Sequence, residues 1–243
     1  MPFREPASRI HLLVGLLSIY NHLTENMRHG SHVHVDETKV TTIGSAGQGQ
    51  TGYVWAFTNL KDVVYTYSAS REGVTLKSVL GDFHGVLVSD FYAAYDSVDC
   101  PHQKCLIHLV RDMNADLFRN PLDTEMVRIG QEFTSLLKGI VEGIDRHGLR
   151  KTRLKRYKHE AVRFLDGVEA MGLTSDVAIG YQKRFKKNRD SLFTFLDYDG
   201  VPWNNNRAEH AIKQFVHLQE GFAHPPRPRA SRHTWSCSAS LKH

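Results

Sequence analysis

The sequence predicts an α/β fold in which a mixed β-sheet is followed by a long helical region. Three features support this: β-rich segments near the start, a short apolar segment that ends in a carboxylate, and long charged helical segments after residue 120. At 243 residues the chain can bury a core without disulfides, so one domain with an insertion is the first expectation.

The first three strands are expected at residues 32–40, 53–60 and 62–70. The segment "HVHVDETKV" alternates valine with polar residues, and the next two segments are rich in β-branched and aromatic side chains. This pattern predicts an antiparallel meander. A helix over residues 71–83 should follow, and then a strand at 85–90, because "GVLVSD" is typical of a strand buried on both faces.

A fifth strand is expected over residues 103–109 and a helix over 110–118. From about residue 120 to 198 the strand signals vanish, and three charged helical segments indicate a helical insertion. The α/β pattern resumes with a helix after "VPWNNN". A mixed sheet that opens with a meander and continues β-α-β is similar to the ribonuclease H-like fold, here with a helical insertion between the fifth strand and the last helix. Fold alone does not fix function.

Residues 1–30 are expected to form a helical lead-in. A basic segment precedes an apolar one, as in signal peptides, but the apolar run is short, interrupted by Ser and Gly, and lacks a cleavage pattern. We therefore expect an amphipathic helix that packs on the body. The sequence contains no stretch long and apolar enough to span a membrane. Three unevenly spaced cysteines fit a reducing cytosol better than a disulfide framework.

The balance of charge favours a polyanionic partner. The chain has 31 Lys and Arg against 26 Asp and Glu, a formal charge of +5. Two dense basic clusters with interleaved aromatic residues lie in the helical insertion, and we expect them to contact a phosphate backbone without reading sequence. A solvated helix face is the simpler alternative. The clusters comprise Arg150, Lys151, Arg153, Lys155, Arg156, Lys158, Lys183, Arg184, Lys186 and Lys187.

Three carboxylates are candidates for a metal site. Asp36 and Asp90 end the cores of two strands, where α/β sheets collect ligands, and together they could share a hard cation such as Mg²⁺. Glu209 lies on the flank of the apolar stripe of the last helix and could complete a two-metal site. Each has a structural alternative: the aspartates could cap or form salt bridges, and Glu209 has capping-box spacing from Asn206.

The segment "CPHQKCLIH" invites a zinc interpretation through Cys100, His102, Cys105 and His108. On a strand, however, Cys105 faces away from both histidines, so the four side chains would not converge easily. For His108 a role in orienting Asp90 or a phosphate is an alternative, and a packed histidine is another.

Four motifs now point to a family. "HVDET", "LVSDFYAAYD", "CLIHLVRDMN" and "VPWNNNRAEHAIK" resemble the catalytic-domain motifs of DDE transposases of the insertion sequence 66 type, over about residues 31–219. The resemblance implies that Asp36, Asp90 and Glu209 form the DDE triad and bind two Mg²⁺ or Mn²⁺ ions. It also implies cleavage of double-stranded DNA at transposon ends, followed by attack of the freed 3′-hydroxyl on target DNA.

Further residues take their expected roles from the same resemblance. Cys105 and His108 form a Cys-x-x-His that related transposases carry after the second aspartate. The side chains expected near the DNA or the metal site are Trp203, Asn205, Asn206, Arg207 and Lys213. By analogy we expect a homo-oligomer on DNA and a bacterial, cytoplasmic, nucleoid-associated location.

The two ends of the sequence depart from the family pattern. About thirty residues precede "HVDET", and residues 220–243 carry three prolines, four basic residues and no periodicity after Glu220. Read two nucleotides later, "HTWSCSASLKH" can encode an apolar segment, so we expect that a frameshift near residues 219–221 replaced the natural end with an irregular tail. The alternatives to an active transposase are therefore an inactive remnant that at most binds DNA non-specifically, and a ribonuclease H-like nuclease or resolvase. The large insertion and the Trp-Asn-Asn-Asn motif count against the last.

Overall fold

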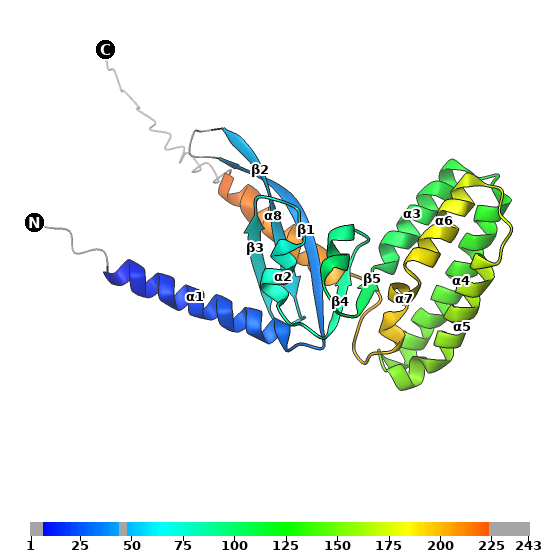
Figure 1. Cartoon of the computed structure of the whole chain (residues 1–243), viewed down its shortest axis with the longest axis horizontal. Coiled ribbons are helices and arrows are strands. Elements are labelled where there is room, and N and C mark those ends of the chain that lie inside the picture. Colours follow the sequence, from blue (N-terminus) through cyan, green and yellow to red (C-terminus); the bar gives the residue numbers. More distant parts are fainter. Residues whose placement is uncertain (1–6, 44–47, 224–243) are drawn as a thin grey trace, which may run out of the picture.

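A five-stranded mixed sheet organises the protein, and its strands follow the order β3-β2-β1-β4-β5 (Figure 1). The computed structural model describes residues 7–43 and 48–223. Strands β1 to β3 form the predicted antiparallel meander, while β4 runs parallel to β1 and β5 parallel to β4. This arrangement is compatible with the expected ribonuclease H-like fold. The strands are β1 (His32–Ile43), β2 (Gly49–Thr58), β3 (Val63–Ser68), β4 (Val86–Ser89) and β5 (His102–Lys104).

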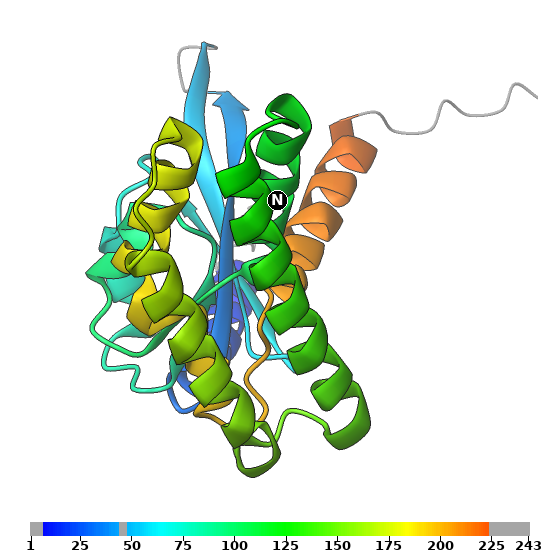
Figure 2. The same ribbon diagram turned by 90° about the vertical axis from the view of Figure 1, so that its right-hand side faces the viewer.

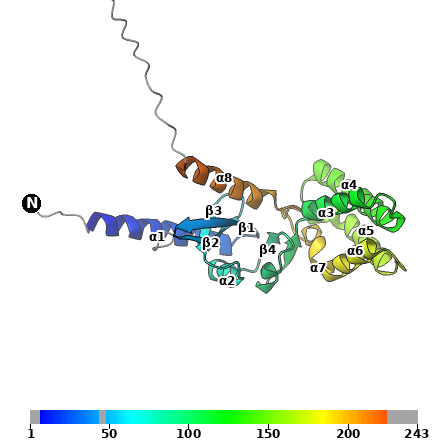
Figure 3. The ribbon, with the colours of Figure 1, turned by 90° about the horizontal axis from the view of Figure 1, so that it is seen from above.

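Different helices cover the two faces of the sheet (Figure 3). Because side chains alternate along a strand, Val35, Trp55 and Phe57 all point to one face, where they pack with α2 (Val74–Leu80). The last helix, α8 (Asn206–Ala223), lies on the opposite face, where the hydroxyl of Tyr65 on β3 donates to the carbonyl oxygen of Ala211 at 2.9 Å. Asp36 alternates with Val35 and therefore points toward α8.

The first helix, α1 (Ala7–Arg28), packs on the body only through its C-terminal part. Tyr20, Leu23 and Met27 join the core beneath the sheet, and the rest of the helix projects away from it (Figure 1). The expected packing of this helix on the body therefore holds for its C-terminal part, where Tyr20, Leu23 and Met27 recur at helical spacing, and other apolar side chains of the helix are exposed. The exposed ones are Val14, Leu16, Leu17 and Ile19.

A helical bundle stands beside the sheet, in front of it in Figure 2. Its centre is aromatic: the ring centroids of Phe133, Phe164 and Phe185 lie 5.1 to 5.6 Å apart. The three helical segments predicted after residue 120 correspond to α4 to α6. The bundle consists of α3 (Leu106–Arg119), α4 (Thr124–His147), α5 (Lys151–Glu169), α6 (Asp176–Lys187) and α7 (Arg189–Leu192). Two short 3-10 helices, η1 (Ala93–Ser97) and η2 (Thr194–Leu196), complete the secondary structure of the described residues.

The expected fifth strand over residues 103–109 is wrong over most of its length. β5 spans only His102–Lys104, and α3 begins at Leu106. Leu106, Leu109 and Met113 recur at helical spacing and are all buried against the bundle. A short apolar run fits both a strand and a helix, and here the helical period continues beyond the run that suggested a strand.

At the other end, α8 continues to Ala223 and so includes residues 220–223 of the expected irregular tail. The remainder of that tail, residues 224–243, lies outside the described residues, as do 1–6 of the expected lead-in. Within the described chain, no helix combines the length and the apolar character needed to cross a membrane.

Candidate active site

The register of β1 and β4 brings Asp36 and Asp90 to the same level of the sheet. His34 on β1 is the parallel partner of Val88 on β4, and each aspartate lies two residues further along its strand, on the same face. Asp90 follows directly after the last residue of β4. Asp36, in contrast to the expectation, does not end its strand, because β1 continues to Ile43 in antiparallel pairing with β2.

The buried side chain of Asn205 fixes the start of α8 against this part of the sheet. Its Nδ2 donates to the carbonyl oxygen of Val35 at 2.8 Å, and its Oδ1 lies 3.1 Å from Nδ1 of His34. Because Oδ1 can only accept, Nδ1 of His34 carries the proton in this arrangement. The backbone N–H of Asn205 donates to Sγ of Cys105 at 3.2 Å. Asn205 therefore ties α8 to both β1 and the start of α3, and its side chain is completely buried.

Glu209 lies in the first turn of α8, on the sheet side. The capping-box alternative fails, because the N–H of Asn206 donates to Oδ1 of Asn204 at 3.2 Å rather than to Glu209. Oε1 of Glu209 is buried and has no hydrogen-bond partner in the described structure, although Nε2 of His108 lies 3.5 Å away. A buried carboxylate oxygen without a partner is costly unless a proton or cation neutralises it.

The electrostatics of Asp36 show the same need for positive charge. Burial, followed by the negative charge of Glu37 and then those of Asp90 and Glu209, raises its pKa to about 7, against a hydrogen bond from the N–H of Glu37 that lowers it. The three candidate carboxylates are thus close enough for each to affect the protonation of Asp36. Carboxylate oxygens of this number suit a hard divalent cation, which would replace the proton on Asp36 and satisfy Oε1 of Glu209. In ligand chemistry these residues therefore fit the expected metal, although among the described residues the one group whose ligand atoms all lie within 4.8 Å of one another is Cys105, His108 and Glu209.

A group of hydrogen-bonded side chains around Glu37, on the opposite face of β1, was not predicted from the sequence. The side chain of Glu37 is 2% exposed and accepts hydrogen bonds from the guanidinium of Arg71 and the hydroxyl of Tyr95. Arg71 also stacks on Tyr92, whose N–H donates to Oδ1 of Asp90 at 2.8 Å. These contacts link β1 to the loop that carries Asp90. The only sequence signal was the adjacency of Glu37 to Asp36, since Arg71 is remote in the chain.

The Cys-x-x-His segment lies beside Glu209. Cys105 is the N-cap residue of α3 and His108 lies in its first turn, so the two side chains share one end of a helix and do not diverge as they would on a strand. The four-residue zinc set is not assembled in the described structure: Nε2 of His102 bonds the carbonyl oxygen of Val98 at 2.9 Å. His108 contacts Glu209 rather than Asp90.

The other residues expected around the site divide into two groups. Trp203 is half-buried against the bundle core, and its carbonyl oxygen accepts the N–H of Leu106 at 3.1 Å. Asn206, Arg207 and Lys213 are exposed on α8 and free of ion pairs with described residues. Trp203 therefore supports the segment that precedes α8, whereas the exposed three are available to a partner.

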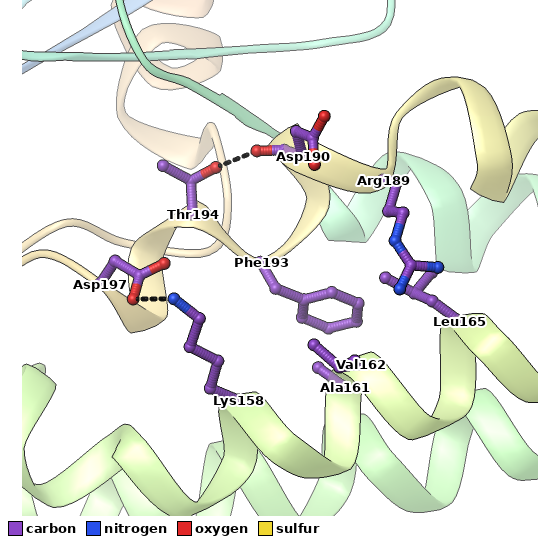
Figure 4. A pocket seen from close by; sticks show the side chains of 9 residues that line it. All are labelled: Lys158, Ala161, Val162, Leu165, Arg189, Asp190, Phe193, Thr194 and Asp197. Atoms are coloured by element: carbon purple, nitrogen blue, oxygen red, sulfur yellow. Dashed lines mark hydrogen bonds and ion pairs between the residues drawn. The ribbon is translucent and has the colours of Figure 1, made fainter.

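The predicted basic clusters are only partly free. Nine of the ten residues are exposed, and seven of the ten have no described acidic side chain within ion-pair distance. Figure 4 shows one of the engaged residues, Lys158, at the rim of a pocket between α5 and the segment that begins with α7. The engaged residues pair Lys158 with Asp197 at 2.6 Å, Arg184 with Asp112 at 2.8 Å and Lys186 with Glu169 at 2.5 Å.

Comparison with known proteins gives one match. The family model described as "Transposase IS66 family" matches residues 8–224, which include every candidate carboxylate and both basic clusters. Searches of curated proteins and of solved structures give no significant match.

Proposed function

The chain belongs to the IS66 family of transposases, and we propose that it cleaves DNA strands at the ends of an insertion sequence and transfers them to target DNA, using Asp36, Asp90 and Glu209. The observation that supports this assignment is that Asp36 on β1, Asp90 after β4 and Glu209 on α8 carry negative charges that act on one another, and that two of them lack a compensating positive charge. The pKa of Asp36 is raised to about 7, and Oε1 of Glu209 is buried without a partner.

We propose Mg²⁺ or Mn²⁺, two ions, as the cofactor of these carboxylates. Such ions, when bound, help to form the attacking oxygen nucleophile and stabilise the departing one at phosphorus. The protein's own contribution is to hold the oxygens in place: Asn205 fixes α8 to β1, His108 approaches Glu209, and Arg71 with Glu37 holds the strand and loop that bear the aspartates. Asp36 must also release a proton near neutral pH before it can bind a cation.

The domain organisation follows from the same proposal. We assign residues 31–219 to a ribonuclease H-like catalytic domain, preceded by the lead-in of 1–30. The helices between about residues 120 and 198 are then an insertion between β5 and α8. This assignment is supported by the parallel pairing of β4 with β1 and of β5 with β4, and by the return of the chain to the sheet at α8.

Double-stranded DNA is the proposed partner. The exposed basic residues of α5 and α6 would neutralise backbone phosphates, while Arg207 and Lys213 on α8 lie on the same helix as Glu209 and could hold the strand to be cut. Because strand transfer joins two ends to one target, we expect a homo-oligomer on DNA. A bacterial chain with this partner would reside in the cytoplasm, on the nucleoid.

The test is cleavage of a plasmid that carries both ends of the element, in Mg²⁺ and in Mn²⁺. We expect the wild-type chain to cut at the ends, and Asp36→Asn, Asp90→Asn and Glu209→Gln to reduce the rate by at least about 10³-fold, as loss of a group acting directly on the reacting atoms does. Asp99→Asn, which changes an exposed carboxylate before β5, is the matched control and should cut normally. Cleavage that survives Asp36→Asn contradicts the assignment. Absence of cleavage by the wild type favours the inactive remnant.

A further inference from the structure

A mixed cluster of sulfur, nitrogen and oxygen ligands lies at the junction of α3 and α8. Sγ of Cys105, a ring nitrogen of His108 and a carboxylate oxygen of Glu209 all lie within 4.8 Å of one another. We propose that these three side chains bind a thiophilic divalent cation, Zn²⁺, at a site distinct from the all-oxygen site of the carboxylates but sharing Glu209 with it.

The ligand chemistry selects the ion. Thiolate and imidazole prefer zinc and other late transition metals, whereas Mg²⁺ takes oxygen ligands. A tetrahedral Zn²⁺ with bonds of about 2.0 to 2.3 Å places its ligands roughly 3.3 to 3.8 Å apart. Because the three ligand atoms lie within 4.8 Å of one another, a contraction of at most about 1.5 Å reaches these separations. Rotation of the side chains of His108 and Glu209, which are both partly exposed, can supply it.

The unsatisfied groups of the cluster support a cation here. Nδ1 of His108 and Oε1 of Glu209 are both buried, and neither has a hydrogen-bond partner in the described structure. Sγ of Cys105 already accepts the N–H of Asn205, which leaves sulfur lone pairs for a metal. The side chains of His108 and Glu209 are 24% and 18% exposed, so an ion can enter. Three protein ligands leave a fourth position for water.

Sharing Glu209 has a consequence that rests on the proposed function. A Zn²⁺ bound to Cys105 and His108 holds the carboxylate of Glu209 on the α3 side and withdraws it from Asp36 and Asp90. Zinc should then inhibit Mg²⁺-dependent cleavage, and the inhibition should depend on Cys105. Cys105 thereby makes the catalytic site, whose Mg²⁺ ligands are all oxygen atoms, sensitive to the difference between Zn²⁺ and Mg²⁺.

The binding itself can be tested without any activity. Co²⁺, titrated into the full chain, reports a thiolate ligand through its sulfur-to-metal absorption band. The background should be Cys100→Ser with Cys237→Ser, which leaves Cys105 as the remaining thiol. We expect one equivalent of Co²⁺ to give the band, stoichiometric Zn²⁺ to displace it, and Cys105→Ser to abolish it. In that background, His108→Asn and Glu209→Gln should each keep the thiol and raise the Kd of Zn²⁺ by more than about tenfold.

The outcomes separate this inference from the proposed function. No band in the Cys105-only protein overturns the zinc site, and so does a Kd of Zn²⁺ that is unchanged by both His108→Asn and Glu209→Gln. If circular dichroism shows that Cys105→Ser is unfolded, the Kd of Zn²⁺ for His108→Asn and for Glu209→Gln provides the test instead. A cobalt band in a chain that does not cleave DNA supports the zinc site and counts against the proposed function. DNA cleavage by a chain that gives no cobalt band supports the proposed function and overturns the zinc site.

Discussion

Replacing Asp36 with asparagine should stabilise the metal-free protein, by an amount that grows with pH. Folding raises the pKa of Asp36 from 3.8 to about 7, chiefly through burial. At about 1.36 kcal/mol per pKa unit, ionising this group in the folded protein costs up to about 4 kcal/mol relative to the unfolded chain. Asparagine has nearly the same shape and no charge, so it avoids this cost.

The sign follows from proton binding. Between about pH 4 and pH 7 the folded wild-type protein holds a proton on Asp36 that the unfolded chain has released. The free energy of unfolding of the wild type therefore falls as pH rises through this window and levels off above the folded pKa. For this group alone, the difference in free energy of unfolding between Asp36→Asn and wild type should widen by roughly 2 to 3 kcal/mol between pH 5 and pH 8.

Urea unfolding in EDTA at pH 5, 6, 7 and 8 measures this difference. Subtracting the wild-type curve from the variant curve cancels the groups common to both, and Asp99→Asn, at an exposed carboxylate, should give a difference that stays flat with pH. Addition of Mg²⁺ at pH 8 should stabilise the wild type and leave Asp36→Asn nearly unchanged. Parallel pH profiles for Asp36→Asn and wild type would refute the reasoning, because Asp36 would then titrate as it does in the unfolded chain.

Three further outcomes are expected. Asn205→Ala removes the two side-chain hydrogen bonds to β1, with Val35 and His34, from a fully buried site. It should lower the free energy of unfolding by about 2 to 4 kcal/mol in urea titrations, with loss of cleavage at a temperature where the variant remains folded. Gly143→Ala places a Cβ 2.5 Å from a buried tyrosine ring of α5 and should destabilise the protein by about 1 to 3 kcal/mol. Gly167→Ala, on α5 with open space around it, should stabilise the protein by up to about 1 kcal/mol. Similar melting temperatures for the two variants would contradict the helix packing described. Lys155→Ala should reduce the slope of the logarithm of the DNA-binding constant against the logarithm of salt concentration by about 0.9. Lys158→Ala should reduce this slope by less, because the ammonium of Lys158 already pairs with an aspartate. Equal slopes for the two variants would show that the ion pair does not persist on DNA.

The sheet was largely predictable from the sequence because its signals are local. Alternation in β1 and the unbroken apolar run of β4 follow from which faces are buried, and both patterns lie within a few residues. The segment after Gln103 was not predictable in this way. Its apolar residues fit both the two-residue period of a strand and the 3.6-residue period of a helix. The segment forms a helix because packing in the bundle buries Leu106 and Leu109.

The candidate site was predictable in part for a similar reason. Asp36 lies in an alternating strand, Asp90 directly follows an apolar one, and Glu209 occurs in a motif with a family likeness, so the candidates could be named from residue type and position. Asn205 was expected near the site, but its role in fixing α8 depends on contacts with His34 and Cys105, which are remote in the chain. The support of Glu37 by Arg71 and Tyr95 depends on the packing of both faces of the sheet, which no local pattern encodes.

The contact between Asn205 and His34 also sets an order of events during synthesis of the protein. These residues are separated by 171 positions, and the helical bundle is encoded between them. At roughly 5 to 20 residues per second of translation, the ribosome produces Asp36 about 10 to 35 seconds before Glu209. A nascent chain can form β1 to β5 and much of the bundle during that interval, but it has no third carboxylate. The proposed nuclease is thus unable to act on DNA until α8 has emerged, so an incomplete chain lacks the complete set of proposed catalytic residues.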